Sequence, residues 1–439
     1  MAPIWLEGLV SSSATQLFGR QVNTASSNST SASGFQATQW QNPQDILSIL
    51  LLLGPDVVQR AIAQLAGRGI TPVAFSFGWV AYAVGALLSS FGDGRLMPGS
   101  ETTLTVIDTN SGHGRDTRNW VLGRLLRDFN NRLDEEMKDE QLHISSEAND
   151  NEKLVPADSG KGEGKGGGKP FEGLRVTMFE VEDEPPTPHG VPTLDWVWCS
   201  GFAVIVVQLG IAAVPWGING QWNTFLVTAA GNLLALIGGS LPQWRKEKWA
   251  CPKKGGDTTT ITEGNGSRSA IVILRKKHVG LKFEVLARGT RVAPATLLTR
   301  IATPVLAAFW ILLLITVAGM KQGTCFQLLT LDTPDLLSIG LLGSIQNLIA
   351  AGVRRSPAAL GIHIKEVETI RARYVAETLK KVEEKYPLVG TSLLNVFFPG
   401  SMRVSEQKQE EIAFWRAALD ARYKENKHGI RLDCLPPAL

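Results

Sequence analysis

The sequence predicts a mainly α fold: a polytopic α-helical membrane bundle of five spans, or six if residues 45–66 also cross, with a small mixed α/β cytoplasmic portion. Apolar residues are concentrated in blocks, the intervals between the blocks are polar, and Lys and Arg gather in those intervals. A block of about 20 apolar residues matches a hydrocarbon core ~30 Å thick, where a helix satisfies its own backbone. The net charge of +3 is too small to indicate a nucleic-acid partner.

The N-terminal part contains a tail and an ambiguous apolar segment. Residues 1–42 are rich in Ser, Thr, Gln and Asn, which predicts a disordered tail. The tail carries a glycosylation sequon at Asn28, usable only outside the cytoplasm. Residues 45–66 are expected to form an interfacial helix, because Asp56 and Arg60 at mid-bilayer would cost several kcal/mol. A sixth span is the alternative.

The first clear span is expected over residues 72–91, within a membrane segment at 43–91. Pro72 suits the first turn of a helix, where its missing N–H is harmless. The interval 92–193 that follows is polar and is expected to lie in the cytoplasm. The elements predicted in it are a strand at 102–107, an amphipathic helix at 115–140, a flexible linker at 145–170 and a strand at 173–181.

A helical hairpin at 194–241 organises the chain, since its two apolar runs are joined only by a short Asn-Gly-Gln turn. The interval 242–298 that follows is strongly basic, so the positive-inside rule places it in the cytoplasm. Strands of a small β-meander are predicted in this interval, at 258–262, 269–274 and 281–287. The two strands of the preceding interval are candidates to join this sheet.

Two more spans are predicted in residues 299–353, and a cytoplasmic helical tail in 354–439. Helices are expected in the tail at 364–385 and 405–425. Five spans place the N-terminal tail outside, where Asn28 would be glycosylated.

The interiors of the predicted spans hold amides and almost no ionisable groups. These amides are Gln208, Asn232, Gln346 and Asn347. Ion-coupled transport usually requires titratable groups within the membrane, so this composition argues against it. The amides are expected to form interhelical hydrogen bonds, and a path for a polar solute is the alternative.

Small residues recur every four positions on three predicted spans. They are Gly231, Ala235 and Gly239, then Ala81, Gly85 and Ser89, and finally Gly340 and Ser344. Such faces allow helices to approach closely within one chain. The alternative is a homo-oligomer that uses the same faces.

A basic stretch follows the hairpin. Its members are Arg245, Lys246, Lys248, Lys253 and Lys254, framed by Trp244 and Trp249. The stretch is expected to anchor the chain at the membrane interface. A contact with anionic lipid is the alternative, because each basic residue near an acidic leaflet contributes about 1 kcal/mol.

No catalytic, cofactor or metal site is predicted. The run GKGEGKGGGKP lacks the spacing of a phosphate-binding loop. Asp108, Ser111 and His113 lie close together, but the Asn-Ser-Gly run between them indicates a turn, and no GxSxG motif supports a hydrolase.

Three groups of sequence runs carry a family resemblance. They are DILSILLLLGPDVVQRAIAQLAG with TPVAFSFGWVAYAVGALLSSFGDGRLMP, LPQWRKEKWACPKK with GNGSRSAIVILR, and SIQNLIAAGVRRSP with SLLNVFFPGSMR. Together they resemble an uncharacterised family of multi-pass integral membrane proteins of filamentous fungi, over about residues 43–403. The resemblance implies a fungal source and a membrane location, and it implies no activity and no site residues.

We therefore expect a non-enzymatic membrane scaffold or interaction protein, whose cytoplasmic part binds a protein partner or the inner leaflet of the bilayer. The alternative is a transporter or channel for a neutral or lipid-like solute.

Overall fold

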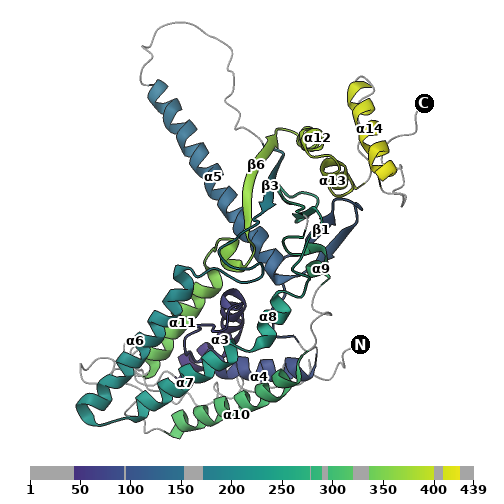
Figure 1. Cartoon of the computed structure of the whole chain (residues 1–439). Coiled ribbons are helices and arrows are strands. Elements are labelled where there is room, and N and C mark those ends of the chain that lie inside the picture. Colours follow the sequence, from purple (N-terminus) through teal and green to yellow (C-terminus); the bar gives the residue numbers. More distant parts are fainter. Residues whose placement is uncertain are drawn as a thin grey trace, which may run out of the picture. The chain divides into compact units, whose positions relative to one another are not determined.

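The computed structural model describes residues 44–92, 95–152, 172–276, 278–288, 295–319, 336–399 and 409–425. Contacts divide the chain into two compact units, Met1–Ser48 and Ile49–Leu439. The second unit contains a helical bundle and a six-stranded sheet with its own helices (Figure 1). The predicted tail at 1–42, with Asn28, and most of the predicted linker at 145–170 lie outside the described residues.

The chain is mainly α-helical, as predicted. The described helices of the bundle are α3 (Gln44–Leu65), α4 (Gly78–Phe91), α6 (Trp196–Asn219), α7 (Asn223–Gly239), α8 (Pro242–Lys248), α10 (Leu297–Gly319) and α11 (Leu336–Gly352). Among the described residues, three segments are long and apolar enough to cross a membrane: Trp196–Ile218, Asn223–Lys248 and Leu297–Val317. Helices α4 and α11 are apolar but shorter. Helix length and composition alone therefore support three spans rather than five or six.

The hairpin of α6 and α7 follows from residues at the two ends of α6. The side chain of Asp195 accepts a hydrogen bond from the backbone N–H of Trp198 at 3.1 Å, which caps the first turn. Gly220 ends the helix in the left-handed conformation, with φ 66°, which favours glycine. The chain then turns directly into α7.

The helix predicted for the first span, over residues 72–91, is only partly present in the structure. Residues 71–76 are buried and non-helical, and α4 begins only at Gly78. Thr71 precedes Pro72, and a residue before proline is disfavoured in the helical conformation. Residues 72–91 therefore combine an extended segment with a helix of 14 residues.

The sheet unites strands from three parts of the chain. They are β1 (Leu104–Asp108), β2 (Gly114–Thr117), β3 (Leu174–Val181), β4 (Thr259–Thr262), β5 (Ser269–Leu274) and β6 (Ile364–Ala372). The spatial order is β2-β1-β4-β5-β3-β6. Strands β3 and β5 are parallel and the other neighbours are antiparallel. The strands of the two polar intervals thus share one sheet, as the sequence suggested for β1 and β3. The sheet is mixed rather than a simple meander, and it also includes β2 and β6.

Two predicted elements adopt a different secondary structure. Residues 281–287 contain the short helix α9 (Phe283–Ala287) instead of a strand. The helix predicted at 364–385 begins as strand β6 and becomes helical only in α12 (Val375–Lys385). Hydrophobic residues three apart in β6 suggested a helix, but pairing with β3 satisfies the backbone groups at that sheet edge.

Helix α5 (Trp120–Glu152) begins later and ends later than the predicted helix at 115–140. The side chain of Asn119 accepts hydrogen bonds from the N–H groups of Val121 and Leu122, at 3.0 and 3.2 Å, and so caps its start. The residues before Asn119 pair in β2 instead.

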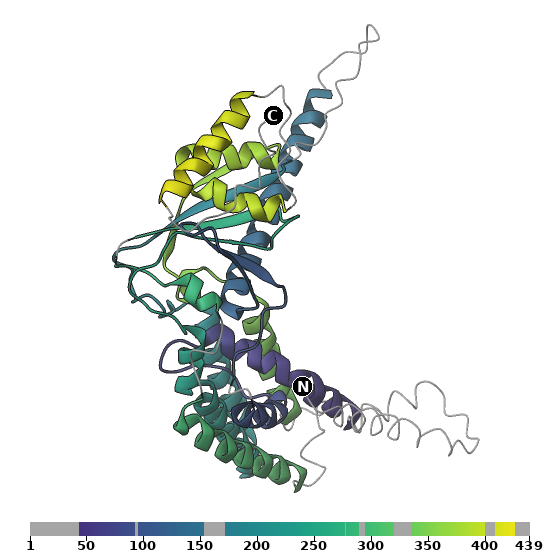
Figure 2. The ribbon, with the colours of Figure 1, turned by 90° about the vertical axis from the view of Figure 1, so that its right-hand side faces the viewer.

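Helices cover both faces of the sheet. On one face, α5 buries Leu122, Leu125 and Phe129 against apolar residues of β1, β3, β4 and β5. On the other, α12, α13 (Val389–Phe397) and α14 (Gln409–Glu425) form a second core that includes the fully buried Trp415. Figure 2 shows the yellow and green helices on one side of the strands and blue α5 on the other.

Candidate functional site

The extended segment at 71–76 lies inside the bundle, where its backbone must find partners other than a helix or a sheet. Val73 and Ala74 are fully buried. The N–H of Phe75 donates to Oδ1 of Asn232 at 3.1 Å, and the N–H of Ala74 donates to Oε1 of Gln346 at 3.5 Å. Side-chain amides of α7 and α11 thus replace the missing helical acceptors.

The carbonyl groups of the segment are satisfied in the same way. Nε2 of Gln208 donates to the carbonyl oxygens of Phe75 and Ile339, at 2.9 and 2.8 Å. Nδ2 of Asn347 donates to the carbonyl oxygen of Ala74 at 3.1 Å. All four predicted amides therefore bind the backbone of this segment, and Gln208 also forms a hydrogen bond of the predicted interhelical kind, to α11.

The small-residue face of α7 packs against the same segment. A β-carbon at Gly231 would lie 2.6 Å from Cδ2 of Phe75, and one at Gly239 would lie 3.4 Å from Thr71. Gly343 of α11 likewise faces the Phe75 carbonyl. The face predicted at Gly231 and Gly239 is thus used within the chain and is not free for a second copy.

The other two small-residue faces differ from each other. Gly340 packs against the ring of Phe77, within the chain. A β-carbon at Gly85 would meet nothing within 4 Å, so the face of α4 stays open at this position.

The segment and α4 enter and leave the bundle at the same end. Near its start, the N–H of Thr71 donates to the hydroxyl of Ser240 at 3.1 Å, directly after α7. Beyond α4, the N–H groups of Leu96 and Met97 both donate to the Glu247 carboxylate at 2.8 Å. Both contacts lie beside α8, so the chain passes into the bundle and returns.

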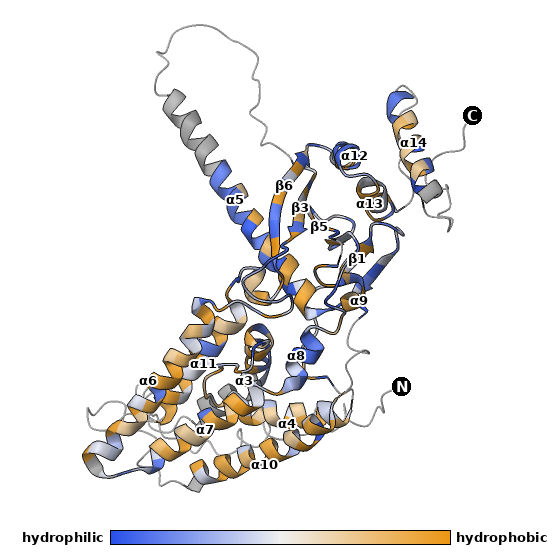
Figure 3. Cartoon of the chain, viewed as in Figure 1, coloured by the Kyte–Doolittle hydropathy of each residue, from blue (hydrophilic) through white to orange (hydrophobic). Residues whose placement is uncertain are grey.

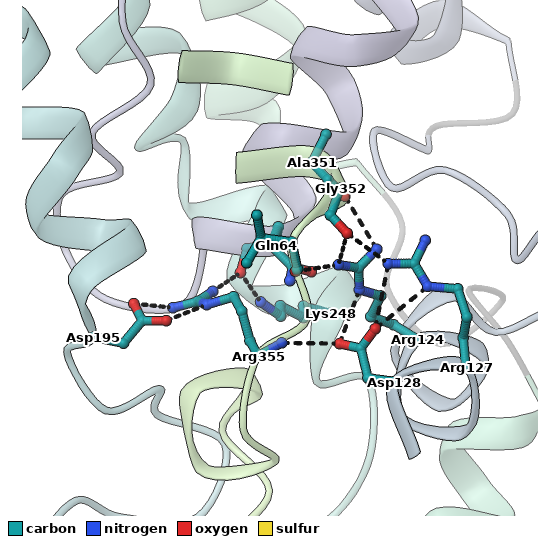
Figure 4. Close-up of polar contacts among 10 residues, drawn as sticks. Gln64, Arg124, Arg127, Asp128, Asp195, Lys248, Ala351, Gly352 and Arg355 are labelled. Atoms are coloured by element: carbon teal, nitrogen blue, oxygen red, sulfur yellow. Dashed lines mark hydrogen bonds and ion pairs between the residues drawn. The ribbon is translucent and has the colours of Figure 1, made fainter. Parts of the chain in front are cut away.

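A buried polar network joins this end of the bundle to α5 (Figure 4). Arg124 on α5 is 6% exposed, and its guanidinium donates to the carbonyl oxygens of Ala351 and Gly352, both at 3.1 Å. These are the last carbonyls of α11, which lack helical partners. A cation at a helix C-terminus also interacts favourably with the helix dipole.

Asp128 lies one turn further along α5 and is 5% exposed. Its carboxylate accepts hydrogen bonds from Nε of Arg124 and from the backbone N–H of Arg355, both at 3.2 Å. It also pairs with Arg127 at 3.3 Å. Burial raises the pKa of Asp128 to about 6, against the opposing effect of the neighbouring arginines.

Arg355 and Lys248 complete the network at the end of α3. Arg355 binds both carboxylate oxygens of Asp195, at 2.6 and 2.7 Å, and donates to the carbonyl oxygen of Gln64 at 2.7 Å. Nζ of Lys248 donates to the carbonyl oxygens of Gln64 and Ala66, at 3.1 and 2.7 Å. Helix ends of α3, α6 and α11 are thus held in one cluster.

The members of the predicted basic stretch differ in exposure. Lys248 is 1% exposed and binds backbone carbonyls, so the predicted lipid contact is wrong for this residue. Arg245, Lys246, Lys253 and Lys254 are exposed.

The tryptophans predicted as interface anchors are also buried. Trp244 and Trp249 are 1% and 4% exposed. Tryptophans that are exposed on the bundle lie elsewhere, at Trp196, Trp216 and Trp222.

The residues considered for catalysis form a turn. The hydroxyl of Ser111 donates to the Asp108 carboxylate at 2.7 Å, and the N–H of Asn110 donates to the same group. Such contacts are typical of an Asx-turn. In the part of the chain that the structure describes, no three His, Cys, Asp or Glu side chains are grouped to hold a metal.

Sequence reasoning missed the network in Figure 4. Its arginines lie in the predicted helix at 115–140 and directly after the last predicted span, and no local pattern there indicates which distant groups they bind.

Comparison of the chain with protein-family models, curated proteins and solved structures gives no match.

Proposed function

We propose that this protein is an integral membrane protein of the multi-pass type, related to the fungal family that it resembles, and that it serves as a non-enzymatic scaffold. The observation that carries the membrane location is the outward direction of its apolar side chains. Val206, Leu233 and Ile315, on α6, α7 and α10, are 66%, 59% and 63% exposed, whereas the amides of the bundle are buried. Water would penalise such a surface, and lipid favours it.

Exposed tryptophans at the two ends of α6 support the same proposal. Trp196 is 61% exposed at its start, and Trp216 is 52% exposed near its end. Twenty residues of helix separate them, which is about 30 Å at ~1.5 Å per residue and equals the thickness of the hydrocarbon core. Tryptophan is enriched at both membrane interfaces.

We place four crossings in α6, α7, α10 and α11, and a fifth in α3. Asp56 and Arg60, whose charges argued against a crossing there, form an ion pair at 3.0 Å and so do not enter the membrane as isolated charges. Residues 71–91 form a re-entrant loop, which is tolerated at membrane depth because protein surrounds its backbone. The positive-inside rule then places the sheet and its helices in the cytoplasm and residues 1–42 outside. This topology keeps five spans but moves the first one from residues 72–91 to α3.

The scaffold role is supported by close packing inside the bundle and by the network at its end. The amides that could line a solute path are engaged with the segment at 71–76. Arg124, Asp128 and Arg355 connect α5, which covers the sheet, to the helix ends of the bundle. The bundle thereby holds the α/β part at the membrane surface, where a protein partner in the cytoplasm can reach it.

Extraction of membranes from expressing cells tests the location. The proposal predicts that the full chain stays in the membrane pellet in alkaline carbonate and is released by detergent. Release by carbonate alone would contradict it.

Chemical cross-linking in those membranes tests the scaffold role, which predicts one stoichiometric protein partner whose cross-links map to the sheet and its helices.

A transporter or channel for a neutral or lipid-like solute is the second candidate. Polar atoms of Gln208, Gln346 and Asn347 are buried around the extended segment without a hydrogen-bond partner. Interrupted helices near the bilayer midplane form the substrate sites of many transporters. If the protein is a scaffold, liposomes that contain it should have the same glycerol permeability as liposomes without protein. A higher permeability that Asn347→Leu abolishes would favour transport instead.

A further inference from the structure

Arg300 is a cation in the apolar outer surface of the bundle. It lies in the first turn of α10, within a segment long and apolar enough to cross a membrane, and its side chain is exposed. Leu297, Leu298 and Ile301 around it are 75%, 58% and 56% exposed. No ion-pair partner of Arg300 occurs among the described residues. An arginine at this depth requires an anion or water at the interface.

Two more basic residues belong to α8, the short helix whose first turn contacts the residue just before α10. The N–H of Thr296, just before α10, donates to Oε1 of Gln243 in the first turn of α8 at 3.3 Å. Arg245 and Lys246 follow Gln243 in the same short helix and are exposed. They too lack an ion-pair partner within the described residues, in contrast to Lys248, which faces inward.

We propose that Arg245, Lys246 and Arg300 form a binding site for the headgroup of an anionic phospholipid. The inference rests on the proposed membrane location. The phosphate lies against Arg300, whose planar guanidinium can donate two hydrogen bonds to it. The acyl chains follow the exposed apolar face of α10, which includes Val305, Phe309 and Leu312. The combination of cationic groups and an adjoining apolar face selects a lipid over a soluble phosphate.

Native mass spectrometry of the full chain in a non-ionic detergent tests the site, with phosphatidylglycerol and phosphatidylcholine as probes. The protein should retain phosphatidylglycerol preferentially. Arg300→Gln, Arg245→Gln and Lys246→Gln should each weaken this binding about fivefold, since each cation near an anionic leaflet contributes a similar increment. Arg416→Gln is the matched control, because Arg416 is exposed on α14, a helix of the sheet part.

Three results would overturn the site. Equal retention of the two lipids would show that charge is not recognised. Displacement of the lipid by glycerol phosphate would identify a soluble anion as the ligand, and an unchanged affinity in all three variants would place the lipid elsewhere. Flotation with liposomes keeps the two proposals apart: a chain that does not float overturns the membrane location together with the site, whereas a chain that floats without lipid preference overturns the site alone.

Discussion

The bundle and the sheet part both bury apolar cores, but they expose opposite kinds of side chain. In the bundle, exposed positions of α10 carry Leu297, Phe309 and Ile315, while amides lie inside. In the sheet part, β3 is buried along almost its whole length and the exposed edge strand β6 is rich in charged residues. Figure 3 shows the contrast as orange helices α6, α7, α10 and α11 against bluer α5, α12 and β6. Both patterns follow from one physical rule: the side chains that a part exposes match the solvent around it. The rule accounts for both parts if lipid surrounds the bundle and water surrounds the sheet part.

The sharpest way to break the comparison is to overfill the interior of the bundle. Gly231→Leu would force a branched side chain into the Phe75 ring. Overpacking typically costs roughly 1–3 kcal/mol and occasionally more, and a β-carbon only 2.6 Å from Phe75 places this variant at the upper end. We expect a large loss of thermal stability in detergent, measured by intrinsic fluorescence. Gly85→Leu is the control, since nothing lies within 4 Å of that position. Equal losses in both variants would contradict the packing described for α7.

The network between the two parts offers the next largest effect. Asp195→Asn would leave the buried guanidinium of Arg355 without its carboxylate, and breaking a buried pair costs about 3 kcal/mol. Hydrogen exchange should then accelerate at the ends of α6 and α11. Arg354→Gln removes the exposed pair with Glu135, and there we expect less than about 1 kcal/mol. If the two variants lose the same stability, burial does not decide the strength of these pairs.

Removal of one amide tests how the extended segment is held. Asn232→Leu would leave the N–H of Phe75 buried without an acceptor, at a cost of about 2 kcal/mol. Detergent melting curves should show this loss. A neutral outcome for the leucine variant would mean that the segment does not depend on this amide.

The smallest expected effect concerns pH. The pKa of Asp128 is about 6 in the folded chain and therefore lies above its ordinary value. The folded state then favours the protonated form, so this group's contribution to stability is complete at low pH and is lost as the pH rises through 6. Between pH 5 and 7 we expect the folded wild-type chain to lose about 1 kcal/mol relative to Asp128→Asn. If the free energy of unfolding changes equally with pH in the two chains over this interval, the raised pKa of Asp128 is contradicted.

Local patterns in the sequence predicted most of the elements but not how distant ones meet. Apolar run length was sufficient for α6, α7 and α10, and short runs rich in β-branched residues were sufficient for β3, β4 and β5. The local pattern was insufficient for β6, where hydrophobic residues three apart fit a helix and only pairing with β3 decides the outcome. The extended course of residues 71–76 depends on amides from three other helices, which no local pattern contains.

The same reasoning explains what was missed at the junction. Asp195 could be placed at the start of a helix because apolar residues follow it directly. Its pairing with Arg355, 160 positions away in the chain, is a tertiary contact that single-sequence patterns do not encode. Lys248 was grouped with its basic neighbours by position, although its side chain turns inward to the end of α3.

Accessibility of spin labels tests the central claim most directly, because it reports which solvent each part contacts. Leu233 of α7 and Val367 of β6 are both exposed apolar residues, at 59% and 49%. In reconstituted membranes, a label at Leu233→Cys should collide with oxygen and be shielded from a water-soluble nickel chelate. A label at Val367→Cys should behave in the opposite way. Access of the nickel chelate to both labels would contradict the account of two parts folded for two solvents.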